Sequence, residues 1–576
     1  MSAELLRLVV RYLPRIRHVL RTEGLPVLVE KIRRRLRTTA LVAPRPPRLL
    51  VFQPPFSPLS FRIHPQPTVS VIVPVYNNFQ ATYACLASLH DHKTRYAFEV
   101  VVVDDDSTDE TGAVLASFDG LHLARNPENL GFVGACNRGA EMARGEFLVF
   151  LNNDTQVQPG WLDALVGTFE SHADCGLAGS QLLYPDGRLQ EAGGIVFSDG
   201  SAWGYGHLDD PYRPEYCYVR EPDYCSGASL AIRRDQFERL GGFDPHFAPG
   251  YYEDTDLAFR VRAVGQRVIY QPHSRVVHLE GATAGRHEEA AGGMKRYQAI
   301  NRHKFTARWT TELATHGARG QDLEMQKERR ATRRALVVDI YMLTPDRESG
   351  SLRMSNLIAV LQGLGFKVTY AASNLEAPEP YVSRLQGQGV EVLYRPYVRS
   401  LETHLASQGR LYDLAILSRA DAASEIMPAV RRHCPKARVI FDTVDLHFLR
   451  EFRLAELTGD ASTQRLAERR KAQELELVDA ADVTLVVSDA EREVLRTLRP
   501  SARIELVSNI HHIYGSPTPF EARRDCLFIG AFAHSPNRDA VLWLAREILP
   551  LVRAEISDLR CHVIGADPPA EVRALA

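Results

Sequence analysis

Residues 69–75 read VSVIVPV and residues 99–109 read EVVVVDDDSTD, and both begin with a short run of β-branched residues. The segment between them has the spacing of an amphipathic helix that ends near His92. The same alternation continues to FLVFL at residues 147–151. Strands that alternate with helices predict a parallel sheet covered on both faces. The expected fold class for residues 69–280 is therefore α/β.

The length and composition indicate a modular globular protein. At 576 residues the chain is too long for one hydrophobic core. Its apolar content of 45% and charged content of 24% are ordinary for globular proteins. The formal net charge of -2 argues against a general nucleic-acid binder, because such proteins usually carry a strongly basic domain.

The cysteines and the apolar runs give an expectation for the cellular location of the protein. The eight cysteines lack paired metal-ligand spacing and several lie in apolar runs, which is typical of reduced, buried thiols. The sequence has no secretory signal at its N-terminus and no apolar run long enough to span a bilayer. We expect a cytoplasmic protein that neither spans a membrane nor is exported.

The first 48 residues are strongly basic. Leu5, Leu6, Val9, Leu13 and Ile16 recur at helical spacing among the basic side chains. Such a helix could dock on anionic lipid at the inner face of the plasma membrane. It could equally be a solvated helix packed on its own domain. Both interpretations remain open.

Prolines and composition divide the rest of the chain. Residues 49–68 are rich in proline, which predicts a stiff linker or a surface strap. Residues 281–334 are polar, with helical spacing, and predict a closing helix and a linker. A second alternating block over residues 335–515 predicts another Rossmann-like sheet. A third sheet begins near residue 525, with room for only two strands and a helix.

Polar residues follow two of the predicted strands of the first block. Asp104, Asp105 and Asp106 follow one strand, and Asn152–Asp154 follow the other. Open α/β sheets bind ligands beyond the carboxyl ends of their strands. Oxygen ligands gathered there suit a hard divalent cation, which would neutralise a diphosphate. Taken singly, each cluster could instead be a turn or a helix cap.

A third acidic cluster lies in GYYEDTDLAFRVRAVG, which begins at Gly250. The apolar spacing of Leu257, Val261 and Val264 predicts one buried helix face, with Gly265 near the helix end. Three acids then lie around the helix N-terminus: Glu253, Asp254 and Asp256. They could serve chemistry or simply complement the helix dipole. The neighbouring Tyr251 and Tyr252 suit either a sugar-lined wall or the core.

His278 ends a short predicted strand in SRVVHLEGATAG. A single histidine is more often structural than a ligand. A ligand role for His278 requires that its ring lie close to Asp154.

These segments resemble, in order and type, the family 2 glycosyltransferases with the GT-A fold, and especially the rhamnosyltransferase-like and O-antigen biosynthetic branch. The resemblance covers about residues 69–280. It is carried by VSVIVPVYNN, VVVDDDSTD, NPENLGFVGACNRGA from Asn126, LVFLNNDTQVQPGWL from Leu148, CSGASLAIRR from Cys225, and YYEDTDLAFR.

The resemblance implies roles for individual residues. Those expected to bind the donor nucleotide are Pro74, Tyr76, Asp105, Asn129, Arg138, Asn152 and Asn153. Asp154 would coordinate Mg2+ or Mn2+, with His278 as a further ligand. Asp254 would be the general base and Glu253 would orient the acceptor. Residues expected to contact the acceptor are Ser226, Gly227 and Tyr252.

This chain departs from the family pattern at one position. Asn152 stands where the family's metal-binding DxD motif has its first acid. An amide oxygen can ligate a cation but brings no charge to it. A cation at this site would therefore be held by one negative charge fewer than the family pattern supplies.

The second block resembles the family 4 glycosyltransferases of the GT-B fold. The resemblance is carried by FDTVDLHFLREFR from Phe441, VVSDAEREVL from Val486, and CLFIGAFAHSPNRDAVLWL from Cys526. The expected order is a GT-A domain, a Rossmann-like GT-B N-terminal domain and an incomplete second Rossmann domain. The family's paired-glutamate motif is not reached by Ala576, so we expect no sugar transfer by this block. SGSLRM from Ser349 begins a helix that could meet a phosphate or be an ordinary capped helix.

Together these features predict an inverting glycosyltransferase. A carboxylate accepts the proton of the acceptor hydroxyl as that hydroxyl attacks the anomeric carbon. The resemblance suggests dTDP-rhamnose or a UDP-hexose as donor, and a lipid-linked glycan or growing surface polysaccharide as acceptor. Three rivals remain. A dehydrogenase would need a GxGxxG loop after the first strand, and this chain has PVYNN there instead. A sugar nucleotidyltransferase and a catalytically silent, glycan-binding scaffold are the others.

Overall fold

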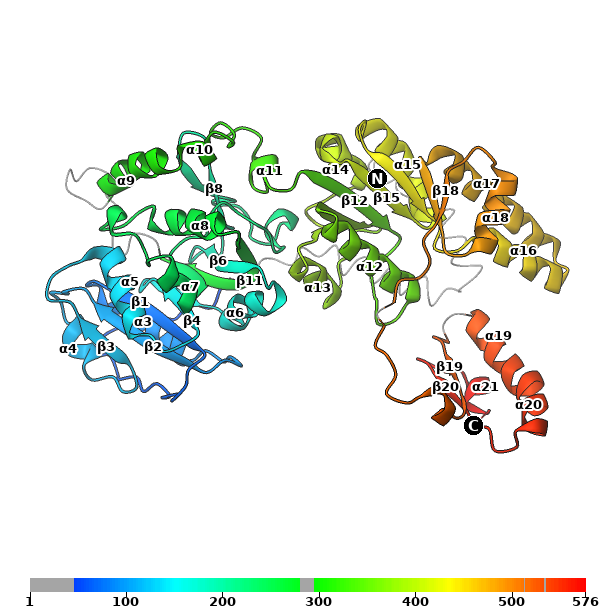
Figure 1. Cartoon of the computed structure of the whole chain (residues 1–576), viewed down its shortest axis with the longest axis horizontal. Coiled ribbons are helices and arrows are strands. Elements are labelled where there is room, and N and C mark those ends of the chain that lie inside the picture. The colour runs from blue at the N-terminus through cyan, green and yellow to red at the C-terminus, as the bar shows by residue number, and fades with distance from the viewer. Residues whose placement is uncertain (1–45, 280–294, 512, 533–534, 576) are drawn as a thin grey trace, which may run out of the picture. The chain divides into compact units, whose positions relative to one another are not determined.

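The computed structural model describes residues 46–279, 295–511, 513–532 and 535–575 (Figure 1). The basic segment predicted over residues 1–48 therefore lies almost entirely outside the described residues. Two compact units are distinguished. The first contains the first sheet, together with residues 365–413, and the second contains most of the chain from residue 414 onward.

The first sheet has nine strands and is mixed rather than wholly parallel. Its first half runs β3-β2-β1-β4, in which β1 (Val69–Val75), β2 (Phe98–Asp104), β3 (His122–Arg125) and β4 (Phe147–Leu151) are parallel. Beyond β4 the order continues β10 (Ser229–Arg233), β6 (Cys175–Leu183), β11 (Arg267–His278) and β5 (Thr155–Val157), and β10 is antiparallel to both neighbours. The strands from which the parallel sheet was predicted, up to residue 151, are parallel, and the mixed half of the sheet comes from later strands. Strands buried on both faces read as apolar runs whichever way they point.

Alternate residues of the central strands enter two separate cores. Val71 and Val73 face one core, which is closed by α3 (Phe79–His90) and α6 (Trp161–Ser171). Ile72 faces the other core, which is closed by α5 (Gly131–Met142), α7 (Arg234–Arg239) and α8 (Glu253–Ala263). The period of two along a strand produces this division. The sheet is therefore covered on both faces, as predicted.

Helix α8 matches its predicted pattern except at the end. Leu257 and Val261 are fully buried. Val264 is 59% exposed, because the helix ends at Ala263. Gly265 follows with a φ of +82°, a conformation that glycine adopts without strain. The predicted helix end is confirmed, and the predicted burial of Val264 is wrong.

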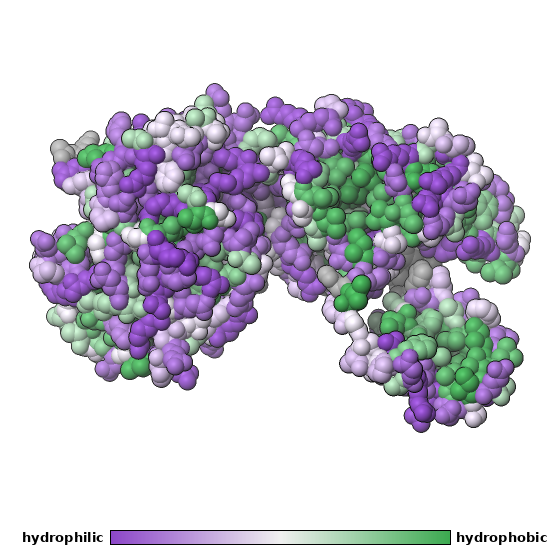
Figure 2. Space-filling model, viewed as in Figure 1, coloured by the Kyte–Doolittle hydropathy of each residue, from purple (hydrophilic) through white to green (hydrophobic). Residues whose placement is uncertain are grey.

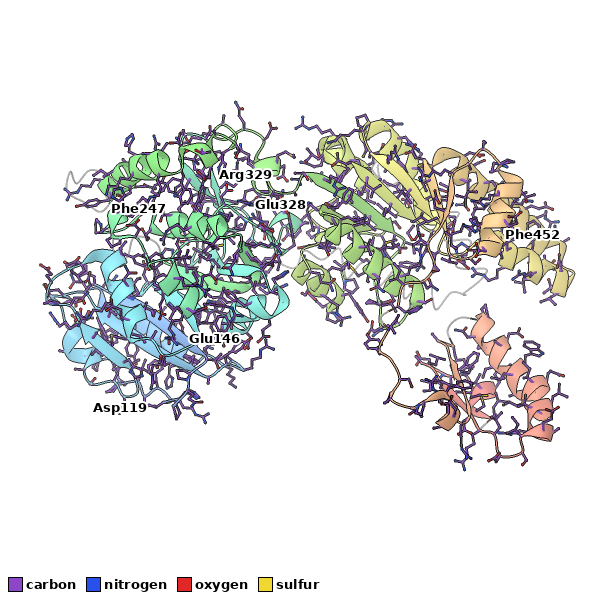
Figure 3. All side chains as sticks on the ribbon, in the orientation of Figure 1. Asp119, Glu146, Phe247, Glu328, Arg329 and Phe452 are labelled. Carbon is purple, nitrogen blue, oxygen red and sulfur yellow. The ribbon has the colours of Figure 1, made fainter. Side chains whose placement is uncertain are left out.

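The proline-rich segment before β1 is a strap on the first domain. The side chains of Gln156 and Gln158 each bond to strap backbone, at Leu50 and Arg48. Further along, the backbone of Asp119, labelled in Figure 3, bonds to the backbone of residues 59 and 61. Backbone bonds at several points fix an extended segment on the surface. Of the two predicted alternatives, the structure shows the strap.

The predicted closing helix is α9 (Lys295–Arg308), followed by α10 (Thr310–Leu313) and α11 (Leu323–Gln326). Asn301 is fully buried in α9 and donates to the carbonyls of Phe247, Gly250 and Tyr251. Arg308 lies over the ring of Phe247, which Figure 3 labels. Helix α9 therefore holds the loop that leads into α8.

The second sheet has seven strands in the order β14-β13-β12-β15-β16-β17-β18. The strands are β12 (Arg333–Asp339), β13 (Phe366–Ala372), β14 (Glu391–Leu393), β15 (Leu414–Ser418), β16 (Arg438–Asp442), β17 (Val483–Val486) and β18 (Ile504–Leu506). Its helices are α12 (Ser349–Gly363), α13 (Tyr381–Gly387), α14 (Leu401–Gln408), α15 (Ala420–His433), α16 (His447–Thr458), α17 (Ala461–Ala480) and α18 (Asp489–Leu498). The order grows outward from β12 in both directions, which is a doubly wound topology. The helix predicted at Ser349 is α12, and the GT-B assignment stays a prediction.

The last described region pairs β19 (Cys526–Ile529) with β20 (Cys561–Ile564) in parallel. Three helices accompany them: α19 (Ser535–Trp543), α20 (Leu549–Glu555) and α21 (Ala570–Arg573). Large apolar side chains are exposed here, among them Leu527, Ile529, Trp543 and Leu551. Figure 2 shows green residues on the visible face of this region. Cys526 is exposed and Cys561 half-buried, whereas the other cysteines are buried. Among the described helices, none combines the length and apolar character that a membrane span needs.

Candidate active site

A turn over residues 226–228 joins two of the predicted acidic sites. The carbonyl of Ala228 accepts a hydrogen bond from Asn152 N at 3.1 Å, which fixes the Asn152–Asp154 loop beside the start of β10. One residue earlier, Gly227 N donates to Asp254 Oδ2 at 2.8 Å. Segments about a hundred residues apart in sequence are therefore held by two adjacent residues of one turn.

Asp105 lies just beyond the end of β2 and is only 3% exposed. Its Oδ1 accepts from Asn126 Nδ2 at 2.6 Å and from Leu130 N at 2.9 Å. Its Oδ2 accepts from Gly131 N at 2.8 Å. A carboxylate with three donors at a helix N-terminus is strongly held. Asp105 therefore fixes the start of α5 where β2 ends.

The start of α5 also contacts the segment that carries Asp254. Val133 N donates to the carbonyl of Pro249, and a Cβ on Gly227 would lie 3.4 Å from the ring of Phe132. Burial raises the pKa of the Cys136 thiol, and the charges of Glu253 and Asp105 raise it further. The structure thus brings Asp105, the Asn152–Asp154 loop and Asp254 to one region of the molecule.

Glu253 and Asp254 are the first two residues of α8. Asp254 Oδ1 accepts from the backbone N of Thr255 at 2.6 Å and from its Oγ1 at 3.1 Å. Glu253 is 6% exposed, and within the described residues its Oε2 has no hydrogen-bond partner. Burial raises the pKa of both carboxyls, and the charge of Asp254 raises that of Glu253 further. Carboxylates in this environment bind a proton more readily than they would in water.

His278 does converge on Asp154. Its Nε2 lies 3.2 Å from Asp154 Oδ1, and its Nδ1 lies 3.0 Å from Gln190 Oε1. The oxygen of Gln190 can only accept, so it places a proton on Nδ1 of His278. The other ring nitrogen, Nε2, can then meet the Asp154 carboxylate in two ways: it carries a second proton, or a cation lies between them.

The side chains around Asp154 supply some of the ligand atoms that a divalent cation needs. Asn152 Oδ1 is buried and has no hydrogen-bond partner among the described residues, so this oxygen is available as a ligand. Carboxylate and amide oxygens suit Mg2+ or Mn2+, whereas an imidazole nitrogen is typical of transition-metal sites rather than of Mg2+ sites. In the part of the chain that the structure describes, however, no three side chains of histidine, cysteine, aspartate or glutamate gather as a metal cluster.

The other residues predicted to bind the donor differ in exposure. Tyr76 follows β1 and is 40% exposed, which leaves its ring accessible. Asn129 Oδ1 accepts from Gly131 N at 3.1 Å at the start of α5, and Arg138 is half-buried on that helix. Pro74 is a buried residue of β1, and Asn153 turns inward to donate to Thr82 Oγ1 at 2.9 Å. Their nucleotide-binding roles stay predictions.

Two of the residues predicted to contact the acceptor, Tyr252 and Ser226, differ in their surroundings. Tyr252 is 7% exposed, donates from its hydroxyl to the carbonyl of Gly200 at 2.9 Å and packs against Phe305. Its ring therefore belongs to the core, the alternative that the sequence left open. Ser226 is half-buried at the turn beside Asp254, and its Oγ accepts from Ala228 N at 3.3 Å.

The sequence interpretation missed a carboxyl group in this region. Glu191 ends β7 (Leu189–Glu191), and its Oε1 accepts from Ser226 N at 3.2 Å. Burial, followed by the charge of Asp254, raises the pKa of Glu191 to about 8. The only sequence indication is an acid directly before the turn AGG in LQEAGG, where Gly193 has a φ of +68°. A single acid before a turn does not indicate which distant groups it meets.

Comparison with known proteins bears on the same residues. The family model for glycosyl transferase family 2 matches residues 70–240. The O-antigen biosynthesis protein RfbC of Myxococcus xanthus is 32% identical over 273 residues, which cover 45% of this chain and 20% of that protein. This chain thus spans about a fifth of that relative's length. The N-acetylglucosaminyl-diphospho-decaprenol L-rhamnosyltransferase of Mycobacterium tuberculosis is 30% identical over 216 residues, covering 34% of this chain and 70% of that protein.

Among solved structures, GalNAc-T7 with UDP, GalNAc and Mn2+ is similar at a TM-score of 0.35 and 18% identity. The alignment covers 43% of this chain and 50% of that one.

Proposed function

Because the chain belongs to glycosyl transferase family 2 through residues 70–240, we propose that its first domain, residues 69–280, is an inverting glycosyltransferase of the GT-A fold. It transfers a sugar from a nucleotide-diphosphate donor to a hydroxyl of a saccharide or lipid-linked glycan. The proposed setting is the synthesis of a bacterial surface polysaccharide of the O-antigen kind.

One observation carries this proposal: the adjacent residues Gly227 and Ala228 bond to Asp254 and to the Asn152–Asp154 loop. In the proposed reaction the acceptor hydroxyl loses its proton to Asp254 while its oxygen bonds to the anomeric carbon. The bond from that carbon to the diphosphate breaks in the same step, which inverts the anomeric configuration. The raised pKa of Asp254 favours this role, because a base with a higher pKa accepts a proton more strongly.

Asp154, His278 and the Asn152 amide oxygen would hold Mg2+ or Mn2+. When bound, such a cation supplies positive charge that stabilises the departing diphosphate. On the protein side, Asp105 keeps α5 in place, and through that helix it keeps Asn129 and Arg138 near the expected nucleotide.

The donor proposed is dTDP-rhamnose or a UDP-hexose. The similarity to a protein named as an L-rhamnosyltransferase favours the first. The proposed location is the cytoplasmic side of the plasma membrane, where residues 1–48 would contact anionic lipid. No nucleic acid is involved. Residues 335–515 are proposed as a GT-B N-terminal domain, and residues 525–576 as part of its second Rossmann domain.

The test is a donor screen with the full-length protein. UDP-, GDP- and dTDP-sugars are supplied with Mg2+ or Mn2+ and with saccharide or lipid-linked acceptors, and release of the nucleoside diphosphate is measured. We expect release that depends on the acceptor and that falls at least about a hundredfold in Asp254→Asn.

Two other outcomes would replace the proposal. Donor binding without release from any sugar would favour a silent, glycan-binding scaffold. Release of pyrophosphate from a nucleoside triphosphate and a sugar phosphate would favour a sugar nucleotidyltransferase.

A further inference from the structure

Strand β7 supplies two side chains to the region described above, and neither has a role in the proposed reaction so far. Gln190 Oε1 lies 3.0 Å from His278 Nδ1, and the opposite nitrogen of that ring lies 3.2 Å from Asp154 Oδ1. The next residue, Glu191, accepts from Ser226 N at 3.2 Å. Neighbouring residues of one strand therefore reach the candidate metal ligand and the turn beside the candidate base.

The turn couples Glu191 to Asp254. Ser226 N donates to Glu191, and the next backbone group, Gly227 N, donates to Asp254 Oδ2 at 2.8 Å. The anchors of the two carboxyl groups are thus N–H groups of successive residues, which are linked through the Ser226–Gly227 peptide. Any shift of the Ser226 end of that peptide changes the direction in which Gly227 N–H presents itself to Asp254.

The surroundings of Glu191 hold it in one place. It is 8% exposed, and β7 pairs Glu191 with Leu182 of β6. On its other side is β9 (Ala202–Gly204), where a Cβ on Gly204 would lie 3.1 Å from Glu191 Oε2. Glycine at residue 204 therefore leaves room for this carboxyl, and the anchor has little freedom to move.

We propose that β7 is a positioning strand for sugar transfer, in which Glu191 orients Asp254 through the turn at Ser226–Gly227 and Gln190 orients His278 against Asp154. This inference rests on the proposed function. Buried metal-binding histidines usually have such a partner on the second ring nitrogen, and its loss typically lowers metal affinity 10- to 100-fold. Misplacement of a reacting group by about 1 Å can lower the rate about a hundredfold.

The two residues give separable effects in the full-length protein. Glu191→Leu removes the acceptor of Ser226 N while roughly keeping the volume, and we expect kcat to fall about 10- to 100-fold with the KM for the donor unchanged. Glu191→Gln keeps an oxygen acceptor and should retain at least about a third of the wild-type kcat. Gln190→Leu should weaken direct Mn2+ binding about tenfold or more, measured calorimetrically, with kcat at saturating Mn2+ nearly unchanged.

A matched control lies before the first residue of β4, at the end of that strand opposite to the Asn152–Asp154 loop. Glu146, labelled in Figure 3, precedes that strand and pairs with Arg233 at the surface. Glu146→Leu removes a carboxylate far from the turn and should leave both kcat and Mn2+ binding at wild-type values.

Each remaining outcome contradicts the inference in a different way. Wild-type kcat in Glu191→Leu, or equal loss in Glu191→Gln and Glu191→Leu, would overturn positioning by Glu191. Unchanged Mn2+ affinity in Gln190→Leu would overturn the role of Gln190. Absence of turnover by the wild-type protein with every donor would overturn the proposed function and this inference together, whereas the other results leave the proposed function standing.

Discussion

Replacing Asp254 by asparagine should separate catalysis from folding. The side chain accepts three hydrogen bonds: from Gly227 N at Oδ2, and from Thr255 N and Oγ1 at Oδ1. Asparagine keeps one oxygen, which can still serve both donors of Thr255. Its NH₂ group then faces Gly227 N–H, so one hydrogen bond is lost, at a cost of about 1 kcal/mol.

Loss of the charge acts in the opposite direction. The charge of Asp254 raises the pKa of Glu253 and of Glu191, which means that it repels both when they ionise. Removing that charge offsets part of the lost hydrogen bond. We therefore expect the free energy of unfolding to change by no more than about 1 kcal/mol, which is a shift in Tm of about 2–4 °C for a domain of this size.

The effect on catalysis should be much larger. A general base contributes typically 10²- to 10⁴-fold, or about 3–5 kcal/mol in the activation free energy. The assay is release of the nucleoside diphosphate at saturating donor and acceptor, with thermal unfolding measured on the same preparations. An activity within threefold of wild type would refute Asp254 as the base. A loss of activity matched by a fall in Tm of 10 °C or more would show instead that the residue acts through folding.

Three further predictions follow from the same contacts. Burial and the charge of Asp254 raise the pKa of Glu191 to about 8, against an ordinary value of 4.5, so between these pH values Glu191 ionises in the unfolded chain and not in the folded protein. The free energy of unfolding should therefore fall by at most a few kcal/mol as the pH rises from 5 to 8. The Tm of Glu191→Gln should fall less over this range, and an equal fall of Tm with pH in the two proteins would contradict the raised pKa. Gly131 has a φ of +72°, and a Cβ there would lie 2.4 Å from Pro249 Cβ, whereas Gly241 has a φ of +82° and a Cβ there would have no atom within 4 Å. Gly131→Ala should therefore lower the free energy of unfolding in urea by at least about 2 kcal/mol, and Gly241→Ala by about 1 kcal/mol. Similar losses of stability in the two variants would contradict the role given to the clash. Deleting residues 414–576, which keeps residues 365–413 with the first sheet, should leave donor hydrolysis by the first domain detectable, and complete loss with a folded remainder would show that the two parts do not act independently.

Much of the fold could be predicted from local patterns. The runs at residues 69–75, 99–104 and 147–151 are strands, α8 begins at Glu253, and Gly265 follows its end. Each of these features depends on burial, periodicity or backbone preference within a few residues. Strand direction does not: the apolar run of β10 leaves open whether that strand is parallel or antiparallel, and it is antiparallel to β4.

The sequence by itself determined where the acidic and amide side chains fall, because Asp105, Asn152 and Asp154 follow apolar strands whose ends are visible as changes in composition. Only the tertiary structure decided what these side chains meet: Gly227 N at Asp254, Gln190 and Asp154 at the two nitrogens of His278, and Glu191 beside them all. The physical reason is that a hydrogen bond between residues some 30 to 130 positions apart leaves no periodic mark on either segment. Such contacts arise only when the packing of the sheet brings the two backbones within reach of one another.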